Sequence, residues 1–210
     1  MNEAPHGPGL PLVAILRGLA PARAPEVADV LFDAGFRALE VPLNRPGALA
    51  SIEAIVQRAR EGVLVGAGTV LETAQVEAVH AAGGRLVVMP HTDAEVIARA
   101  RQLGMFVAPG VFTASEAFAA LKAGAHALKL FPAEVLGPAG LAALRTVLPP
   151  GTALWPVGGI TPEAIAAWCR AGATGFGVGG ALFRPDETLQ RLRERAQAFV
   201  AAWQAAQVSR

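Results

Sequence analysis

Apolar, β-rich runs alternate with alanine-rich amphipathic stretches along nearly the whole chain. Eight runs are present, at residues 12–16, 38–43, 63–65, 86–89, 105–107, 127–131, 153–157 and 175–178. The stretches between them are predicted to be helical and lie at 24–34, 47–60, 73–82, 93–103, 115–123, 138–147 and 162–171, followed by a last one at about 185–206. Strands that alternate with helices in this way indicate βαβ units and a parallel α/β sheet.

The spacing of these units favours one parallel fold over another. The runs are taken to end at Arg17, Leu43, Thr69, Pro90, Gly110, Phe131, Val157 and Gly179, so that successive ends lie 20 to 26 residues apart. Eight even repeats predict a (β/α)8 TIM barrel, although that fold more usually takes ~250 residues. A doubly wound open sheet is the alternative, but it rarely needs eight such repeats. We therefore expect one barrel domain over residues 10–206, preceded by a flexible segment at 1–9.

Charge and composition exclude several classes of protein. Eighteen basic and seventeen acidic side chains leave a net charge of +1, which gives no basic surface for nucleic acid or an anionic membrane. No apolar run approaches the ~20 residues of a membrane span, and we expect no signal peptide. The single cysteine, Cys169, excludes an intramolecular disulfide, and the four histidines lack metal-ligand spacing. These features predict a cytoplasmic protein without a catalytic metal.

Lysine is rare in this chain, which has sixteen arginines and only Lys122 and Lys129. An amine, unlike a guanidinium, can lose its proton and attack a carbonyl. Lys122 falls in the helical stretch 115–123, where a solvated surface position is favoured. Lys129 alternates with leucines in the run 127–131, and Glu40 alternates with apolar residues in the run 38–43, so both are predicted to point into the barrel.

Two interpretations of this buried pair are open. The first is a structural ion pair, which is costly because both charges lose their hydration. The second, which we favour, is a nucleophilic amine whose pKa is lowered by burial, next to a carboxylate that moves protons.

Glycines follow the last two predicted strands, as Gly158 and Gly159 and as Gly179 and Gly180. In a barrel, the loops after strands seven and eight commonly hold a phosphate on bare backbone amides. The two clusters therefore predict a phosphorylated substrate. The glycines at 66 and 68 are not followed by the Lys-Ser/Thr of a nucleotide P-loop, so ATP is not implied.

Three other polar residues lie at predicted strand ends. Thr69 either hydrogen-bonds a substrate carboxylate or caps the next helix. Arg17 either binds an anion or forms a salt bridge at the rim. His91, which follows Pro90, either lines the site or lies on the surface.

Four segments resemble one known family in order and spacing: GAHALKLFPAEVLG at 124–137, GFRALEVPLN at 35–44, GAGTV at 66–70 and VGGITP at 157–162. They resemble the 2-keto-3-deoxy-6-phosphogluconate/4-hydroxy-2-oxoglutarate aldolases, over about residues 10–200. The resemblance implies a class I aldolase that needs neither metal nor organic cofactor and forms homotrimers. It implies that Lys129 forms the Schiff base and that Glu40 is the proton donor and acceptor. The substrate-binding residues that it implies are Arg17, Thr69, Pro90, Val157, Gly158, Gly159, Gly179 and Gly180.

Departures from the family pattern refine the expected substrate. Gluconate-type members usually have Thr-Leu-Arg where this chain has Pro42-Leu43-Asn44, and a threonine where it has Val157. Both features, with AILRG at 14–18, resemble the galactonate branch. The resemblance thus implies cleavage of 2-dehydro-3-deoxy-6-phospho-D-galactonate to pyruvate and D-glyceraldehyde 3-phosphate. A third departure is Gly180, where family members often have a phosphate-binding serine.

Alternatives to this function remain. The nearest is cleavage of the gluconate epimer, or of both epimers. A phosphate-binding isomerase or epimerase would need paired acid and base groups but no lysine. A non-catalytic sugar-phosphate-binding barrel, with a structural Lys129–Glu40 pair, is the most remote.

Overall fold

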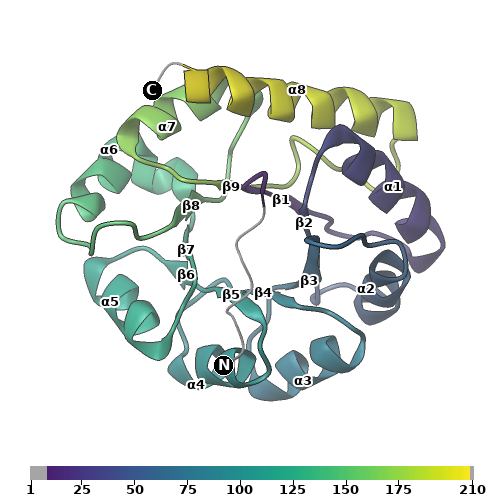
Figure 1. The fold of residues 1–210 in the computed structure, drawn as a ribbon, viewed down its shortest axis with the longest axis horizontal. Coiled ribbons are helices and arrows are strands. Elements are labelled where there is room, and N and C mark those ends of the chain that lie inside the picture. Colours follow the sequence, from purple (N-terminus) through teal and green to yellow (C-terminus); the bar gives the residue numbers. More distant parts are fainter. Residues whose placement is uncertain (1–8, 209–210) are drawn as a thin grey trace.

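The protein is an α/β fold in which parallel strands curl around a common axis inside a layer of helices (Figure 1). The structure is a computed structural model and describes residues 9–208. The flexible segment expected at 1–9 thus lies, except for its last residue, outside the described residues. The parallel α/β architecture predicted from the repeats is confirmed.

Within residues 9–208, nine short strands form two sheets, and every pairing within these sheets is parallel. The larger sheet has the order β5-β4-β3-β2-β1-β9, and the smaller one has the order β6-β7-β8. Their bounds are β1 Leu12–Ile15, β2 Ala38–Pro42, β3 Leu64–Gly68, β4 Leu86–Val88, β5 Phe106–Ala108, β6 Gly110–Val111, β7 Leu128–Leu130, β8 Leu154–Pro156 and β9 Phe176–Val178.

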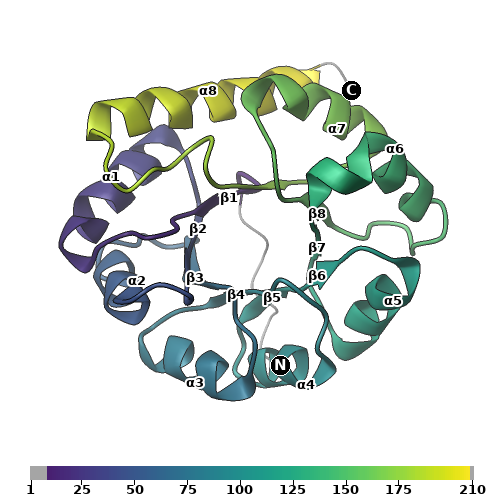
Figure 2. The same cartoon turned by 180° about the vertical axis from the view of Figure 1, so that it is seen from behind.

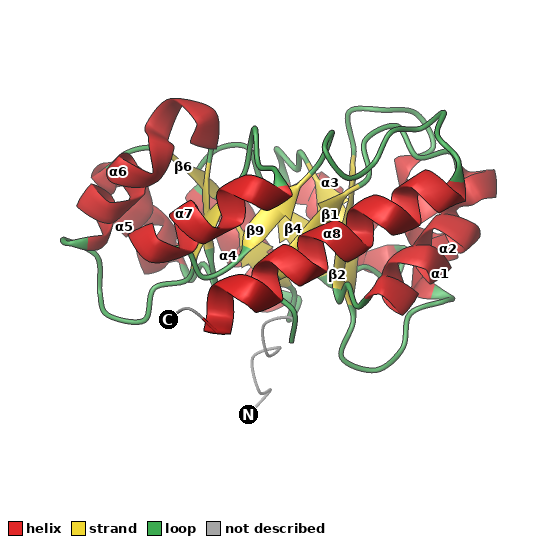
Figure 3. Cartoon of the chain, turned by 90° about the horizontal axis from the view of Figure 1, so that it is seen from above, coloured by secondary structure: helices red, strands yellow, loops and turns green. Residues whose placement is uncertain are grey.

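In the described part of the chain, eight α-helices and two short 3-10 helices cover the outside of the strands (Figures 2 and 3). They are α1 Ala24–Ala34, α2 Ala48–Val56, α3 Thr73–Ala81, α4 Ala94–Gln102, α5 Ala114–Ala123, α6 Ala133–Arg145, α7 Ile165–Ala171 and α8 Leu189–Val208, with η1 Pro21–Arg23 and η2 Pro162–Ala164. Helix α5 begins with a capping box between Thr113 and Glu116 and ends at Gly124, whose φ of 101° favours glycine. None of the helices in residues 9–208 is long and apolar enough to span a membrane.

Two proline-rich places differ from the sequence prediction. The fifth predicted strand is split into β5 and β6 around Pro109, which lacks the N–H that a continuous ladder needs. Helix α6 begins at Ala133 rather than at 138, because Pro132 occupies the N-cap position. Gly137 then breaks the helix with φ 67° and ψ 166°, so the predicted stretch 138–147 corresponds to its second half.

Apolar side chains fill two layers, one on each face of the curled strands. The larger layer, between strands and helices, contains Phe36, Phe176 and Phe199. The smaller one lies inside the strands and includes Phe106, which stacks on Trp155 at 5.4 Å between ring centroids. Only three polar or charged side chains within residues 9–208 are classed as buried: Ser51, Glu40 and Lys129. The burial of Ser51 is compensated by its hydrogen bond to the carbonyl of Leu19. The burial of the charged Glu40 and Lys129 needs a separate explanation.

Candidate active site

Lys129 lies in the middle of β7 and points inward. Its neighbours Leu128 and Leu130 pack in the outer layer, so the alternation of a strand turns Lys129 to the inner face. Its Cα pairs with those of Gly110 and Trp155 on the flanking strands. The side chain is 7% exposed, and Nζ lies 4.6 Å from the centroid of the Phe131 ring. This aromatic face would stabilise a positive charge on the nitrogen.

Glu40 occupies the corresponding inward position on β2 and is 2% exposed. Gly68 makes room for its carboxyl group, since a Cβ at that glycine would lie 2.0 Å from Oε2. Oε2 has no hydrogen-bond partner among the described protein atoms. A buried carboxyl oxygen without a partner is uncommon and points to a site for substrate or water.

Glu40 and Lys129 line one small cavity, together with apolar side chains that include Val157 and Ile15. The centre of a water molecule could occupy about 10 Å³ of this cavity, which is enough room for about one water. None of the ion pairs formed within residues 9–208 joins the two side chains. The structural ion pair considered from the sequence is therefore not observed.

Burial shifts the pKa values of these two groups in opposite directions. Desolvation raises the pKa of Glu40 to about 7, although Lys129 and Arg17 act to lower it. Desolvation also lowers the pKa of Lys129, and the charge of Arg17 lowers it further while Glu40 opposes the shift. The lowered pKa of Lys129 favours its uncharged amine, and Glu40, with a pKa of about 7, can both give and take a proton near neutral pH.

A larger pocket of about 530 Å³ adjoins the small cavity and shares Ile15, Val157 and Gly177 with it. Six of the eight predicted substrate-binding residues line this pocket: Arg17, Val157, Gly158, Gly159, Gly179 and Gly180. The pocket follows the carboxyl ends of β1, β8 and β9, where barrel folds carry their chemistry. Phe131, Phe183 and Arg184 also line it, and Arg184 was not found by the sequence analysis.

The glycines of this pocket present free backbone amides. Outside the strand pairing, none of the hydrogen bonds of the described residues uses the N–H of Gly159 or Gly180 as donor. Gly158 and Gly159 have φ values of 112° and 66°, and a Cβ at Gly158 would lie 2.1 Å from Oε2 of Glu134. Only glycine fits at position 158 for both reasons. Such unpaired amides suit a phosphate group.

Arg17 stands exposed just beyond β1, and its Nη1 donates to Oδ1 of Asn44 at 3.1 Å. Its charge acts on both Glu40 and Lys129. The ion pairs within residues 9–208 do not include Arg17, so the rim salt bridge considered from the sequence is not observed. Because Asn44 is neutral, it holds the guanidinium without cancelling its charge. The sequence singled out Asn44 only as a departure from the family pattern.

Thr69 and Pro90 follow β3 and β4 but do not line either cavity. Thr69 adopts a φ of 57°, which is strained for a β-branched residue and is typical of functional sites. It does not cap the next helix, because α3 begins at Thr73 with Glu72 at the N-cap position. His91 is exposed, as its surface interpretation expected.

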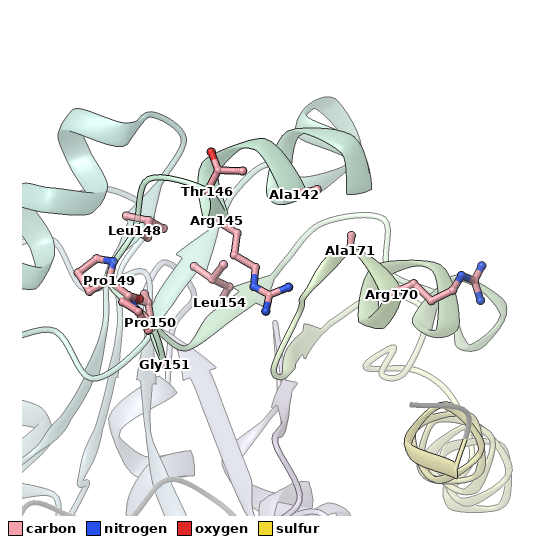
Figure 4. A pocket seen from close by; sticks show the side chains of 11 residues that line it. Ala142, Arg145, Thr146, Leu148, Pro149, Pro150, Gly151, Leu154, Arg170 and Ala171 are labelled. Carbon is pink, nitrogen blue, oxygen red and sulfur yellow. The ribbon is translucent and has the colours of Figure 1, made fainter.

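A second large cavity, of about 610 Å³, lies elsewhere (Figure 4). Arg145, Thr146 and Arg170 line it where α6 and α7 end and before β8 begins. It therefore lies at the amino ends of the strands, on the face opposite to Lys129, where barrel residues serve stability rather than chemistry. In Figure 4 the guanidinium of Arg170 points away from that of Arg145.

Comparisons with known proteins agree with this geometry. The family model described as KDPG and KHG aldolase matches residues 9–196. The 2-dehydro-3-deoxy-6-phosphogalactonate aldolase of Escherichia coli (strain K12) is 48% identical over 197 residues, which cover 94% of this chain and 96% of that protein. The KHG/KDPG aldolase of the same strain is 32% identical over 158 residues, which cover 74% and 71%. The native KDPGal structure matches with a TM-score of 0.93 at 47% identity and covers 95% of this chain and 97% of that chain. This chain therefore belongs to the KDPG and KHG aldolase family.

Proposed function

We propose that the protein is a class I aldolase that cleaves 2-dehydro-3-deoxy-6-phospho-D-galactonate to pyruvate and D-glyceraldehyde 3-phosphate. The observation that carries this proposal is the pair of buried, oppositely shifted groups, Lys129 and Glu40, at the base of a pocket with free backbone amides. Its chemistry needs only these side chains and water.

The first half of the reaction forms the Schiff base. The uncharged amine of Lys129 adds to the C2 ketone and gives a carbinolamine. Glu40 in its protonated form donates a proton to the departing hydroxyl, and loss of water leaves an iminium. The ring of Phe131, 4.6 Å from Nζ, stabilises this cation.

The second half breaks the C3–C4 bond. Glu40, now ionised, removes the proton of the C4 hydroxyl, and the C3–C4 electron pair moves into the iminium to give an enamine. D-glyceraldehyde 3-phosphate leaves as the aldehyde. Glu40, acting through water, returns its proton to C3, and hydrolysis of the resulting iminium releases pyruvate and the free amine. A carboxyl group with a pKa near 7 is suited to both directions of proton transfer.

The substrate carries an anion at each end. We assign its carboxylate to Arg17, whose charge acts on Lys129, and to Thr69, which follows β3, and its phosphate to the glycine amides. Val157, which lines both cavities, would shape the wall near the reacting carbons, and Pro90 would contact the substrate from the segment that follows β4. The members of the phosphate set are Gly158, Gly159, Gly179 and Gly180.

The galactonate epimer is favoured over the gluconate epimer by two observations. Val157 and Asn44 are the residues by which the chain departs from the gluconate pattern, and both lie at the site. The identity to the galactonate enzyme of E. coli is also 48%, against 32% for the KHG/KDPG enzyme. Values of kcat/KM for the two epimers, measured side by side, decide the question. Equal or higher values for the gluconate epimer would contradict the assignment.

The Schiff base itself is tested by reduction with borohydride in the presence of pyruvate. We expect a covalent adduct at Lys129 in peptide mapping. Lys129→Arg should lose both the adduct and turnover, because guanidinium stays protonated. Lys122→Arg is the matched control, since Lys122 is exposed on α5, and it should keep both. Turnover by Lys129→Arg, or no adduct in the unchanged protein, would refute the mechanism.

We also propose how the two sheets close, how many copies of the chain assemble and where the protein is located. The two sheets would form one closed (β/α)8 barrel, since only Pro109 separates β5 from β6 and a parallel bridge joins Val157 to Gly177. Exposed Phe112, Phe118 and Val135, around α5 and the start of α6, support a homotrimer contact on that side. Light scattering in solution tests the trimer. A cytoplasmic location fits a substrate with a carboxylate at one end and a phosphate at the other, which cannot cross a bilayer unaided.

A further inference from the structure

We propose that Arg184 binds the phosphate group of the substrate and supplies the contact that Gly180 cannot make. This inference rests on the proposed aldolase function and adds a binding residue to it. Arg184 lies outside the motifs by which the sequence was interpreted, and its role follows from its position in the folded chain.

The chain after β9 turns back so that Arg184 meets the glycine loop. The amides of Leu182 and Phe183 both donate to the carbonyl of Gly179, at 2.7 and 2.9 Å. This tight turn places Arg184 in the wall of the pocket that the four glycines line. Its Nε lies 3.5 Å from the carbonyl of Gly180, the outer limit of a hydrogen bond.

The exposed charge of Arg184 has only a distant ionic partner within the described part of the chain. Its ion pair with Glu187 has an N–O distance of 3.5 Å, and its side chain is 63% exposed. Glu187 already has a closer partner, because Arg195 donates to it at 2.6 Å. Arg23 donates to the carbonyls of Pro185 and Glu187 and so fastens this segment to η1. Glu187 therefore holds Arg184 loosely at the mouth of the pocket and leaves it free to turn toward an anion.

The charges of the pocket match the two ends of the substrate. Two guanidinium groups line it, and Arg17 belongs to the end near Glu40 and Lys129. Arg184 is the cation at the glycine end. A carboxylate, that of Glu134, lies against the backbone of Gly158 and would repel a phosphate there. A guanidinium at the mouth offsets this repulsion, and it can give a phosphate two hydrogen bonds.

Gly180 itself supports a test by rescue. A Cβ at this glycine would have no atom within 4 Å, and its φ lies outside the left-handed region. A serine therefore fits without strain and would restore the hydroxyl that other members of the family carry. If Arg184 replaces that hydroxyl, a serine at position 180 should compensate in part for its loss.

The experiment compares the phosphorylated substrate with the same sugar acid lacking phosphate. For Arg184→Gln we expect the ratio of their kcat/KM values to fall about tenfold, as for one charged hydrogen bond. Arg184→Lys should lower the ratio less than Arg184→Gln does, because an ammonium still binds phosphate as a point charge. In the double variant Arg184→Gln, Gly180→Ser, this ratio should be at least threefold higher than in Arg184→Gln alone. Arg191→Gln is the matched control, because Arg191 pairs with Glu194 on α8 and does not line the pocket.

A binding measurement separates this inference from the aldolase proposal. Titration calorimetry with inorganic phosphate needs no turnover, and we expect the Kd of Arg184→Gln to be about tenfold higher than that of the unchanged protein. Thermal melting shows that each variant is folded. A ratio and a Kd within twofold of the unchanged protein would overturn the role of Arg184, even if pyruvate is trapped at Lys129. Failure of pyruvate trapping with a raised Kd would instead refute the aldolase and keep the phosphate site.

Discussion

Replacing Gly68 by alanine should disable catalysis while leaving the fold largely intact. The added Cβ would lie 2.0 Å from Oε2 of Glu40 and 2.3 Å from its carboxyl carbon. The carboxyl group is the flexible end of a side chain, so it can retreat, but it must leave the position from which it serves Lys129. The same change at Gly66, on the same strand and face, meets the backbone oxygen of Leu86 at 1.9 Å instead.

These contacts set the expected magnitudes. An ordinary contact begins near 3.4 Å, so the carboxyl oxygen must move by about 1.4 Å. A misplacement of about 1 Å at a reacting group costs on the order of 10²-fold in rate, or about 2.7 kcal/mol of transition-state stabilisation. We expect Gly68→Ala to lower kcat by at least that factor and the free energy of unfolding by only about 1 kcal/mol. Gly66→Ala should lower the free energy of unfolding by about 3 kcal/mol, because a backbone oxygen cannot retreat alone.

Pyruvate release, coupled to lactate dehydrogenase, measures the first effect, and urea unfolding measures the second. Borohydride trapping with pyruvate then reports whether the lysine still reacts when the carboxyl group has moved. A Gly68→Ala enzyme with kcat within threefold of the unchanged protein would refute the reasoning, since Glu40 would then not need its present position. A Gly66→Ala protein of unchanged stability would refute the steric argument.

Three further predictions concern charge. The kcat/KM for cleavage should fall about tenfold per pH unit well above pH 7, because the free enzyme must carry the proton that Glu40 gives to the departing hydroxyl. Glu40→Gln should lose both this dependence and most activity, and a profile that stays flat above pH 7 in the unchanged protein would contradict the role of Glu40 as acid. The pKa of His126 is lowered to about 4 by burial and by Arg101, so the folded state binds fewer protons and stability should fall as the pH drops from about 6.5 toward 4. Because solvent screens the partly exposed ring, we expect this drop in pH to lower the free energy of unfolding by about 1–2 kcal/mol. The urea midpoint of His126→Asn should lack this pH dependence. Asn44→Ala should raise the KM for pyruvate trapping two- to tenfold by releasing Arg17, and an unchanged KM would show that the 3.1 Å hydrogen bond does not position it.

Local periodicity made most of the fold predictable. The helix expected at 24–34 is α1, with the same bounds, because an apolar face at helical spacing is closed by Gly35 in the left-handed conformation. The inward direction of Lys129 and Glu40 also followed from strand alternation alone. The predicted strand and helix bounds were wrong near prolines. Pro138 resembles a helix start, but Gly137 is a break within α6 rather than its beginning.

The sequence allowed us to predict most residues of the candidate site one by one, but not how they are arranged around the pocket. Each of Lys129, Glu40 and the glycine pairs lies on or next to a strand, where the pattern of neighbouring residues reveals its direction. Arg184 follows a strand as well, yet it lies on an irregular turn that no periodicity describes. Its place in the pocket depends on hydrogen bonds to Gly179 and on the fastening of residues 185 and 187 by Arg23.

The amino-acid sequence by itself determined the order of strands and helices, the inward direction of Lys129 and Glu40, and the positions of the glycines that follow the last two strands. These are consequences of bond geometry over a few neighbouring residues. Only the tertiary structure decided that Gly68 makes room for Glu40, that Asn44 holds Arg17, and that no ion pair joins Glu40 to Lys129. Those contacts join segments more than 25 residues apart. Their distances, and hence the desolvation that shifts both pKa values, follow from how the curled strands and the helices outside them pack together.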